Sequence, residues 1–298
     1  MPLISTIGAA SATGFGQRRG GKGPYDIQFL VVAGGGAGRS YGGGGGGAGG
    51  LRTSTYSEVA LGTVLTVSVG AGATANGVRG ENSSLSGPGL STFTANGGGT
   101  PPDPNAGGQS GGSGSGGGVT GENGGQTNPG GSGNLGGFSP AEGTNGGSGR
   151  GVPSTRAGGG GGGASQAGQN GSGSPKGGNG GAGTVSTITG PSVTYAGGGG
   201  GGSQGSNPAG DGGAGGGGDG GNDNSFGSDV SQPGTDGLGG GGGSMSANPT
   251  GPRNGGSGVI IIRMPTTSYS GTSTGSPEVL TSGTETILRF TGDGSYTA

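Results

Sequence analysis

The chain has 298 residues, of which 97 are glycine, and a mass of only 26.9 kDa, so it carries little side-chain volume for its length. Hydrophobic residues make up 23% of the sequence and aromatic residues 4%. This is too few for the conventional core of one large enzyme domain. The formal net charge of -2, with 9% charged residues, lacks the high charge that is typical of disordered chains.

The first part of the chain predicts β-strands. Residues 26–33 begin with alternating apolar and polar positions and end in a short apolar run. Residues 63–69 place Leu65, Val67 and Val69 on one face of a strand. We therefore predict a docking segment at residues 1–24, followed by a β-strand region at residues 25–96 that contains the first glycine run.

The middle of the chain, residues 97–256, is dominated by glycine with short segments of Asn, Ser, Thr, Asp and Pro. Glycine recurs at every third position in blocks such as 108–117 and 212–221, and the phase is reset between blocks. A continuous Gly-X-Y frame would indicate collagen, whereas the resets favour short polyglycine-II rods with three residues per turn, joined by turns. The alternative is a flexible linker, which requires no three-residue register.

A bundle of such rods would have main chain as its interior. A helix of this type makes no internal hydrogen bonds, so its N–H and C=O groups need partners on neighbouring rods. Glycine has no Cβ to hold the rods apart. We therefore expect the 97–256 region to be a polyglycine-II bundle.

The last part of the chain, residues 257–298, again predicts strands. Residues 258–264 form an apolar run typical of a strand buried on both faces. Further short strands are predicted at residues 278–281, 285–291 and 295–298. Glycine disfavours helix by about 1 kcal/mol per position, so we expect almost no α-helix. The predicted fold is mainly β, with a non-regular glycine-rich region: the N- and C-terminal strands form a small β-sandwich that clamps the rod bundle.

Several function classes are disfavoured by residues that are missing or rare. The chain has no His and no Cys, which removes the usual ligands of zinc, haem and iron–sulfur sites and the usual catalytic triads. Its twelve Lys and Arg residues are scattered and the pI is near 5.0, so no nucleic-acid surface is expected. The N-terminus lacks a secretory signal pattern, and the longest apolar runs are too short to span a bilayer. We expect no enzyme activity, no cofactor and no membrane insertion.

Two segments partly match nucleotide-binding motifs. Residues 16–22 match the start of a phosphate-binding loop, but Gly23 and Pro24 stand where a Ser or Thr and a helix are needed. Residues 29–38 look like a strand entering a dinucleotide-binding turn, yet a glycine run replaces the required helix. Neither segment predicts a nucleotide site.

A series of aspartates is the candidate for a metal site. Asp211, Asp219 and Asp223 are close enough in sequence to supply oxygen ligands to a calcium ion. The other interpretation is that they are solvated turn residues that bond to their own backbone.

Two isolated aromatic residues are the candidate receptor contacts. Phe138 and Phe226 lie in glycine-rich turns, far in sequence from any apolar partner. Loop side chains held on a rigid scaffold commonly make binding contacts. The alternative is that each ring packs back onto the glycine bundle or lies between subunits.

The order of several segments resembles glycine-rich structural proteins of tailed bacteriophages. The segments are residues 29–38, 42–51, 67–72, 258–263, 275–277 and the ending 288–297. The resemblance implies a virion protein, and it extends more distantly to the polyglycine-sandwich adhesins that cap some long tail fibres and bind the bacterial surface through variable loops.

The resemblance leads us to expect a structural virion protein, a tail-fibre or appendage component that acts in host attachment. Its expected partners are other virion proteins, contacted through residues 1–24, and a bacterial surface polysaccharide or outer-membrane protein. We also expect it to be multimeric on the particle. The first alternative is a capsid or tail decoration protein with a purely architectural role. The second is a glycine-rod ice-binding or extracellular matrix protein.

Overall fold

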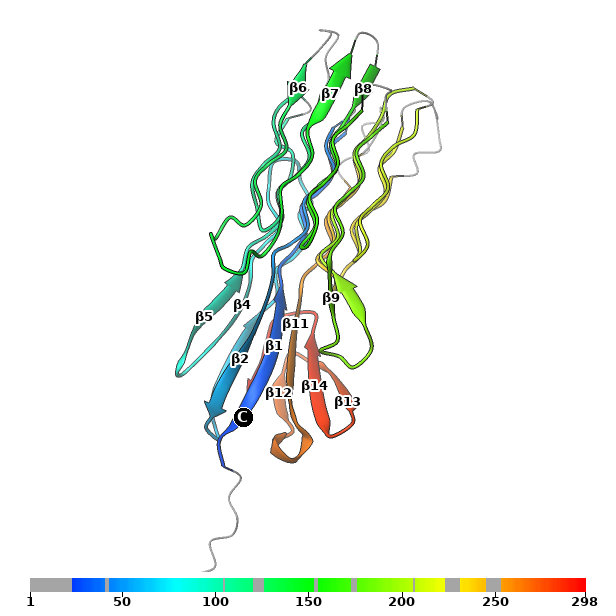
Figure 1. Cartoon of the computed structure of the whole chain (residues 1–298). Coiled ribbons are helices and arrows are strands. Elements are labelled where there is room, and N and C mark those ends of the chain that lie inside the picture. Colours follow the sequence, from blue (N-terminus) through cyan, green and yellow to red (C-terminus); the bar gives the residue numbers. More distant parts are fainter. Residues whose placement is uncertain are drawn as a thin grey trace, which may run out of the picture.

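The computed structural model describes residues 23–40, 43–103, 105–119, 126–152, 155–172, 176–205, 207–222, 231–244 and 253–298. Residues 1–22 of the predicted docking segment lie outside this part, as do Asp223 and Phe226. The molecule is elongated, with a β-sandwich at one end and a bundle of non-regular strands running away from it (Figure 1).

The first sheet of the sandwich is antiparallel, with the order β13-β14-β11-β1-β2. Its strands are β1 (Tyr25–Val32), β2 (Leu51–Val59), β11 (Val259–Pro265), β13 (Glu278–Ser282) and β14 (Glu285–Phe290). Strands β1 and β11 come from distant parts of the chain and pair in the middle, with Leu30 opposite Ile261. The strands predicted at 26–33 and 258–264 are confirmed, each shifted by one residue.

The second sheet is also antiparallel, with the order β12-β15-β3-β4-β5. Its strands are β3 (Val64–Ser68), β4 (Ser83–Gly87), β5 (Leu90–Ala95), β12 (Thr272–Thr274) and β15 (Gly294–Thr297). Buried side chains from both sheets form one core, which includes Phe29, Ile262 and Phe290 from the first sheet and Leu65 and Tyr296 from the second. The predicted sandwich of N- and C-terminal strands is therefore confirmed.

The outer face of the first sheet is covered as well. A hairpin of β9 (Thr184–Ser186) and β10 (Val193–Tyr195), which comes from the glycine-rich middle, packs there. Leu30, Ile261 and Ile287 form a second core with Tyr195 of this hairpin. Because both faces of this sheet are buried, β1 ends in a continuous apolar run and β11 consists largely of one.

The glycine-rich region forms rods that bond to one another through the main chain. The N–H groups of residues 45–50 donate in turn to three neighbouring rods and then to the same three again. Their acceptors, at 2.8–3.0 Å, are the carbonyl oxygens of Gly159, Gly242, Gly99, Gly162, Gly239 and Asn96. A direction that repeats every third residue is the signature of a helix with three residues per turn.

Other rods donate to the same central segment from the remaining directions. The carbonyl oxygens of Gly45, Gly46 and Gly47 accept hydrogen bonds from the N–H groups of Gly116, Gly199 and Gly36, at 2.8–2.9 Å. The segment at 43–50 is thus surrounded by six rods, and main-chain hydrogen bonds fill the interior of the bundle. The expectation of packed polyglycine-II rods, rather than a flexible linker, is confirmed.

Glycine is required in this interior because the rods are so close together. A Cβ at Gly45 would lie 2.2 Å from the carbonyl oxygen of Gly199, and a Cβ at Gly46 would lie 2.1 Å from that of Gly36. Both atoms belong to main chain that other hydrogen bonds hold in place, so neither can move aside easily.

Helical structure is nearly absent from the described ranges, where it consists of one 3-10 turn, η1 (Thr266–Ser268). None of the described helical residues forms a segment long and apolar enough to cross a membrane. A small sheet of β6 (Thr127–Asn128), β7 (Gly149–Val152) and β8 (Thr155–Ala157) lies at the end of the bundle farthest from the sandwich (Figure 1). The mainly β fold class is confirmed.

Candidate functional site

Two parts of the molecule are candidate sites. The first is the end of the rod bundle that carries β6, β7 and β8, which we call the loop end (Figure 1). The second is a groove beside β2, where the bundle joins the sandwich. Several segments that connect described rods lie outside the described residues, namely 41–42, 120–125, 153–154, 173–175, 223–230 and 245–252.

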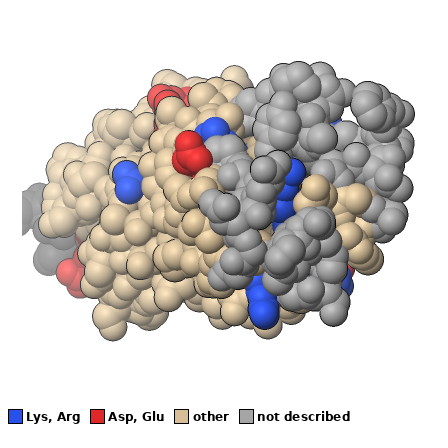
Figure 2. Space-filling view, turned by 90° about the horizontal axis from the view of Figure 1, so that it is seen from above, with Lys and Arg blue, Asp and Glu red and all other residues tan. Residues whose placement is uncertain are grey.

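Charged side chains at the loop end are scattered, and some of them donate hydrogen bonds to neighbouring loop residues. Figure 2 looks down on this end and shows basic and acidic side chains at separate points of the described surface. Arg39 donates to the carbonyl oxygen of Pro102, and Arg253 donates to the Ser231 hydroxyl at 3.0 Å. The described surface therefore offers no single strongly charged patch here.

The aspartates proposed as calcium ligands bond to nearby main chain and amides. The Asp211 carboxylate accepts from the Asn179 side chain at 3.2 Å, and Asp219 accepts from the N–H of Gly212 at 2.7 Å. Both contacts fit turn-stabilising aspartates. Among the residues that the structure describes, no group of three or more acidic side chains is placed to hold a metal ion.

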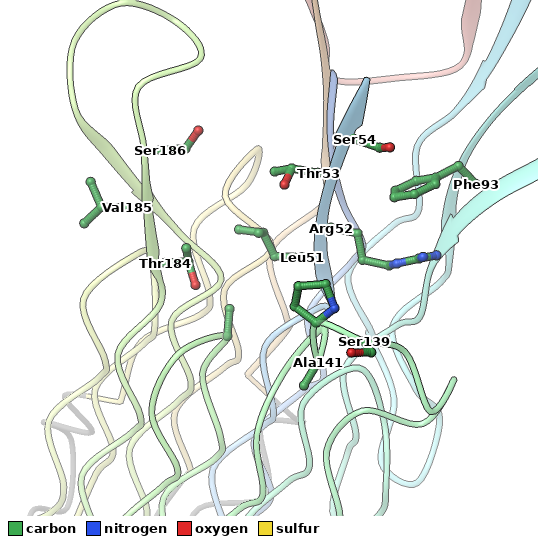
Figure 3. A pocket seen from close by; sticks show the side chains of 12 residues that line it. Leu51, Arg52, Thr53, Ser54, Phe93, Ser139, Ala141, Thr184, Val185 and Ser186 are labelled. Atoms are coloured by element: carbon green, nitrogen blue, oxygen red, sulfur yellow. The ribbon is translucent and has the colours of Figure 1, made fainter. Parts of the chain in front are cut away.

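The groove beside β2 is a recess with a volume of about 570 Å³. Residues 51–54 of β2 form its floor, β9 residues 184–186 one wall and Phe93 of β5 the other (Figure 3). The turn at residues 139–141 closes one end. A second recess of about 320 Å³ begins at residues 53–55 and spreads across the sheet to Gln28 of β1 and Arg263 of β11, beneath residues 186–188.

A guanidinium group held between two aromatic rings lies on one side of this groove. Arg52 stands 4.0 Å from the ring centre of Phe93 and 3.6 Å from that of Phe138. Its Nη1 also donates to the carbonyl oxygen of Thr94 at 2.6 Å. Stacking between two rings fixes the orientation of the guanidinium plane.

A buried carboxylate fixes the turn that closes the groove. Glu142 is fully buried, and its carboxylate accepts from the main-chain N–H and the side-chain amide of Asn96 at 2.9 and 2.7 Å. Its carbonyl oxygen accepts from the N–H of Leu51 at 2.8 Å. Burial lowers the pKa of the Arg52 guanidinium, and the Glu142 carboxylate acts in the opposite direction.

Phe138, one of the two predicted receptor contacts, is thus half-buried against Arg52 and lies near the groove rather than at the loop end. Phe226 lies outside the described residues. Sequence reasoning missed Arg52 and Glu142. No local signal marks them, because their partners come from other segments of the chain.

Residues 10–265 match the family model described as a glycine-rich domain. The chain belongs to this glycine-rich domain family. The matched region runs through β1 and the rods to the end of β11, and the strands β12 to β15 that complete both sheets follow it. No curated protein and no solved structure showed significant similarity to the chain.

Proposed function

We propose that this glycine-rich protein is a non-enzymatic structural component of a tailed-phage virion, part of a tail fibre or appendage that attaches to the host surface. The observation that carries the proposal is the rod bundle, in which a central segment is bonded through its main chain to six neighbours. The virion assignment is supported by the order of segments, which resembles that of phage structural proteins.

The bundle suits a rigid platform for loops. Its main-chain hydrogen bonds extend from the sandwich to the loop end, and the sandwich itself is held by two apolar cores. Binding residues are frequently carried on loops that a rigid scaffold positions. We therefore assign contact with a bacterial polysaccharide or outer-membrane protein to the loop end.

The two ends of the molecule suit opposite roles. Strand β1 begins at the sandwich end, so residues 1–24 join the molecule there, far from the loop end (Figure 1). An attachment to the particle through residues 1–24 would leave the loop end facing the host. This arrangement is the one expected of an appendage protein.

The first test is mass spectrometry of purified particles of the phage that encodes the chain, followed by antibody labelling of intact particles. Label on a fibre or appendage supports the proposal. Label on the capsid shell would instead favour a decoration protein, and absence from the particles would overturn both.

The second test is binding of the purified chain to bacterial cells. The chain has no cysteine, so a Thr284→Cys variant carries one dye at the sandwich end. Replacing residues 223–230 by a Gly-Ser segment of equal length should abolish cell binding. The matched control is Leu61→Ser, a change at an exposed residue in the turn between β2 and β3, which should leave binding unchanged. Equal loss in both variants would contradict a role for the loop end.

A further inference from the structure

Strand β2 is an edge strand with an open outer side. The N–H of Leu51 donates to Glu142 on the side away from β1. Alternate residues of a strand direct their main-chain groups to the same side, so the N–H and C=O of Thr53 and Thr55 also point outward. Within the described part of the chain, no main-chain group pairs with them.

The groove has the position of a missing sixth strand. It lies along β2, with β9 on one side and Phe93 on the other (Figure 3). The carbonyl oxygen of Glu142 already makes the first hydrogen bond of such a strand, to Leu51. The groove follows residues 51–54, a length of about 14 Å for an extended chain.

We propose that this groove binds residues 3–11 of a second copy of the chain, which adds as an antiparallel strand beside β2. This segment lies outside the described residues, and its sequence begins Leu-Ile-Ser-Thr-Ile. β-branched residues of this kind favour extended structure. Addition of a strand to an exposed sheet edge is a general mode of recognition, in which the main chain supplies the affinity.

Chain direction favours a second copy over the same copy. Tyr25, at the start of β1, pairs with Val59 at the end of β2. A segment that leads directly into β1 from the groove would therefore run parallel to β2, and parallel pairing is slightly less stable per residue. The segment of another copy can enter in the antiparallel direction. The 22 residues before Gly23 can span up to about 75 Å, enough to reach a neighbour.

The contact would be head-to-tail, since the donated segment and the groove are different surfaces. Such contacts close into rings when the rotation allows it. The inference therefore goes beyond host attachment and supplies a physical basis for a multimer.

The first experiment compares the full chain with a chain that lacks residues 1–16. The full chain should associate with increasing concentration in sedimentation, and the shortened chain should stay monomeric. A synthetic peptide of residues 1–12 should bind the shortened chain and slow amide exchange at Thr53 and Thr55. The control peptide carries Thr6→Pro, which disrupts strand pairing, and should not bind.

The second experiment changes the groove. Thr53→Pro removes one outward N–H, a change that an edge strand tolerates, and should weaken peptide binding by roughly tenfold through the lost hydrogen bond. Thr53→Val keeps the N–H and should bind as the parent does. Equal melting temperatures would establish that both variants fold.

Association that persists without residues 1–16 would overturn the proposal, as would protection of Thr53 and Thr55 that is independent of concentration. A full chain that does not associate at all would also overturn it. These measurements need neither cells nor particles, so their failure would leave the host-attachment proposal to its own tests.

Discussion

The main-chain N–H of Gly46 donates a 2.9 Å hydrogen bond to the carbonyl oxygen of Gly242, which belongs to a rod almost two hundred positions further along the chain. Contacts of this kind take the place of side-chain packing in the bundle. Their strength depends on how closely two main chains can approach.

Gly46→Ala should therefore destabilise the protein severely. The added Cβ would lie 2.1 Å from the carbonyl oxygen of Gly36, and overpacking against fixed main chain should cost more than about 3 kcal/mol. We expect a large drop in melting temperature or failure to fold. The matched control is Gly292→Ala, because a Cβ at Gly292 meets nothing within 4 Å. Equal melting temperatures for the two variants would contradict the close-packed bundle.

Phe138→Ala tests whether this ring has a structural role. The ring covers the guanidinium of Arg52 at 3.6 Å, and its loss should reduce the free energy of unfolding by about 1 kcal/mol. Denaturant unfolding measures this change. The control is Val185→Ala, at a residue that is 61% exposed. If Phe138→Ala leaves stability intact but abolishes cell binding, Phe138 is a receptor contact, as one interpretation of the sequence has it.

Glu142→Gln tests the turn that closes the groove. The carboxylate is buried and accepts two hydrogen bonds from Asn96. Replacing it by a neutral amide should lower the free energy of unfolding by about 1.5–3 kcal/mol, since hydrogen bonds to a buried charge are lost. Glu278→Gln, which removes a half-exposed partner of Arg289, should change it by less than about 1 kcal/mol. A larger effect at Glu278 would show that burial of Glu142 is not what stabilises the turn.

Alkaline pH should destabilise the sandwich through its buried tyrosines. Burial and the 2.9 Å hydrogen bond to Tyr296 raise the pKa of Tyr25 above its ordinary value of 10.0, and burial also raises the pKa of Tyr195. Above pH 10 the unfolded chain loses these protons first, so it binds fewer protons than the folded chain and stability falls as pH rises. Below pH 10 this contribution is fully present.

The measurement is urea unfolding from neutral to alkaline pH. The double variant Tyr25→Phe, Tyr195→Phe should show a shallower loss of stability above pH 10 than the parent chain does. An identical slope would show that other groups cause the alkaline loss.

Strands with an apolar pattern were predictable, and strands without one were not. The runs that became β1 and β11 follow from their Ile, Leu and Val content. Strand β2 was missed because residues 52–55 are Arg-Thr-Ser-Thr, a polar sequence that gives this part of the strand no apolar face. Its polar inner side is explained by its place at the sheet edge, where Arg52 reaches across to Thr94 of the other sheet.

The rods themselves follow from the three-residue glycine register, but their neighbours do not. A glycine that faces Gly242 and one that faces Gly159 are identical in sequence, so the glycines themselves do not specify which rods pair. The groove was unpredictable because Arg52, Phe93 and Phe138 are separated in the sequence and come together only in the tertiary fold.

An interior made mostly of main chain also has a consequence for how the sequence of such a molecule can vary. Because most contacts between rods are main-chain hydrogen bonds, and side-chain bonds such as that of Ser113 to Gly163 are fewer, two adjacent outer rods and their connecting turn can be gained or lost together while the central segment keeps its six partners. The number of rods can therefore change two at a time, and the sequences of the turns can diverge, without repacking of a side-chain core.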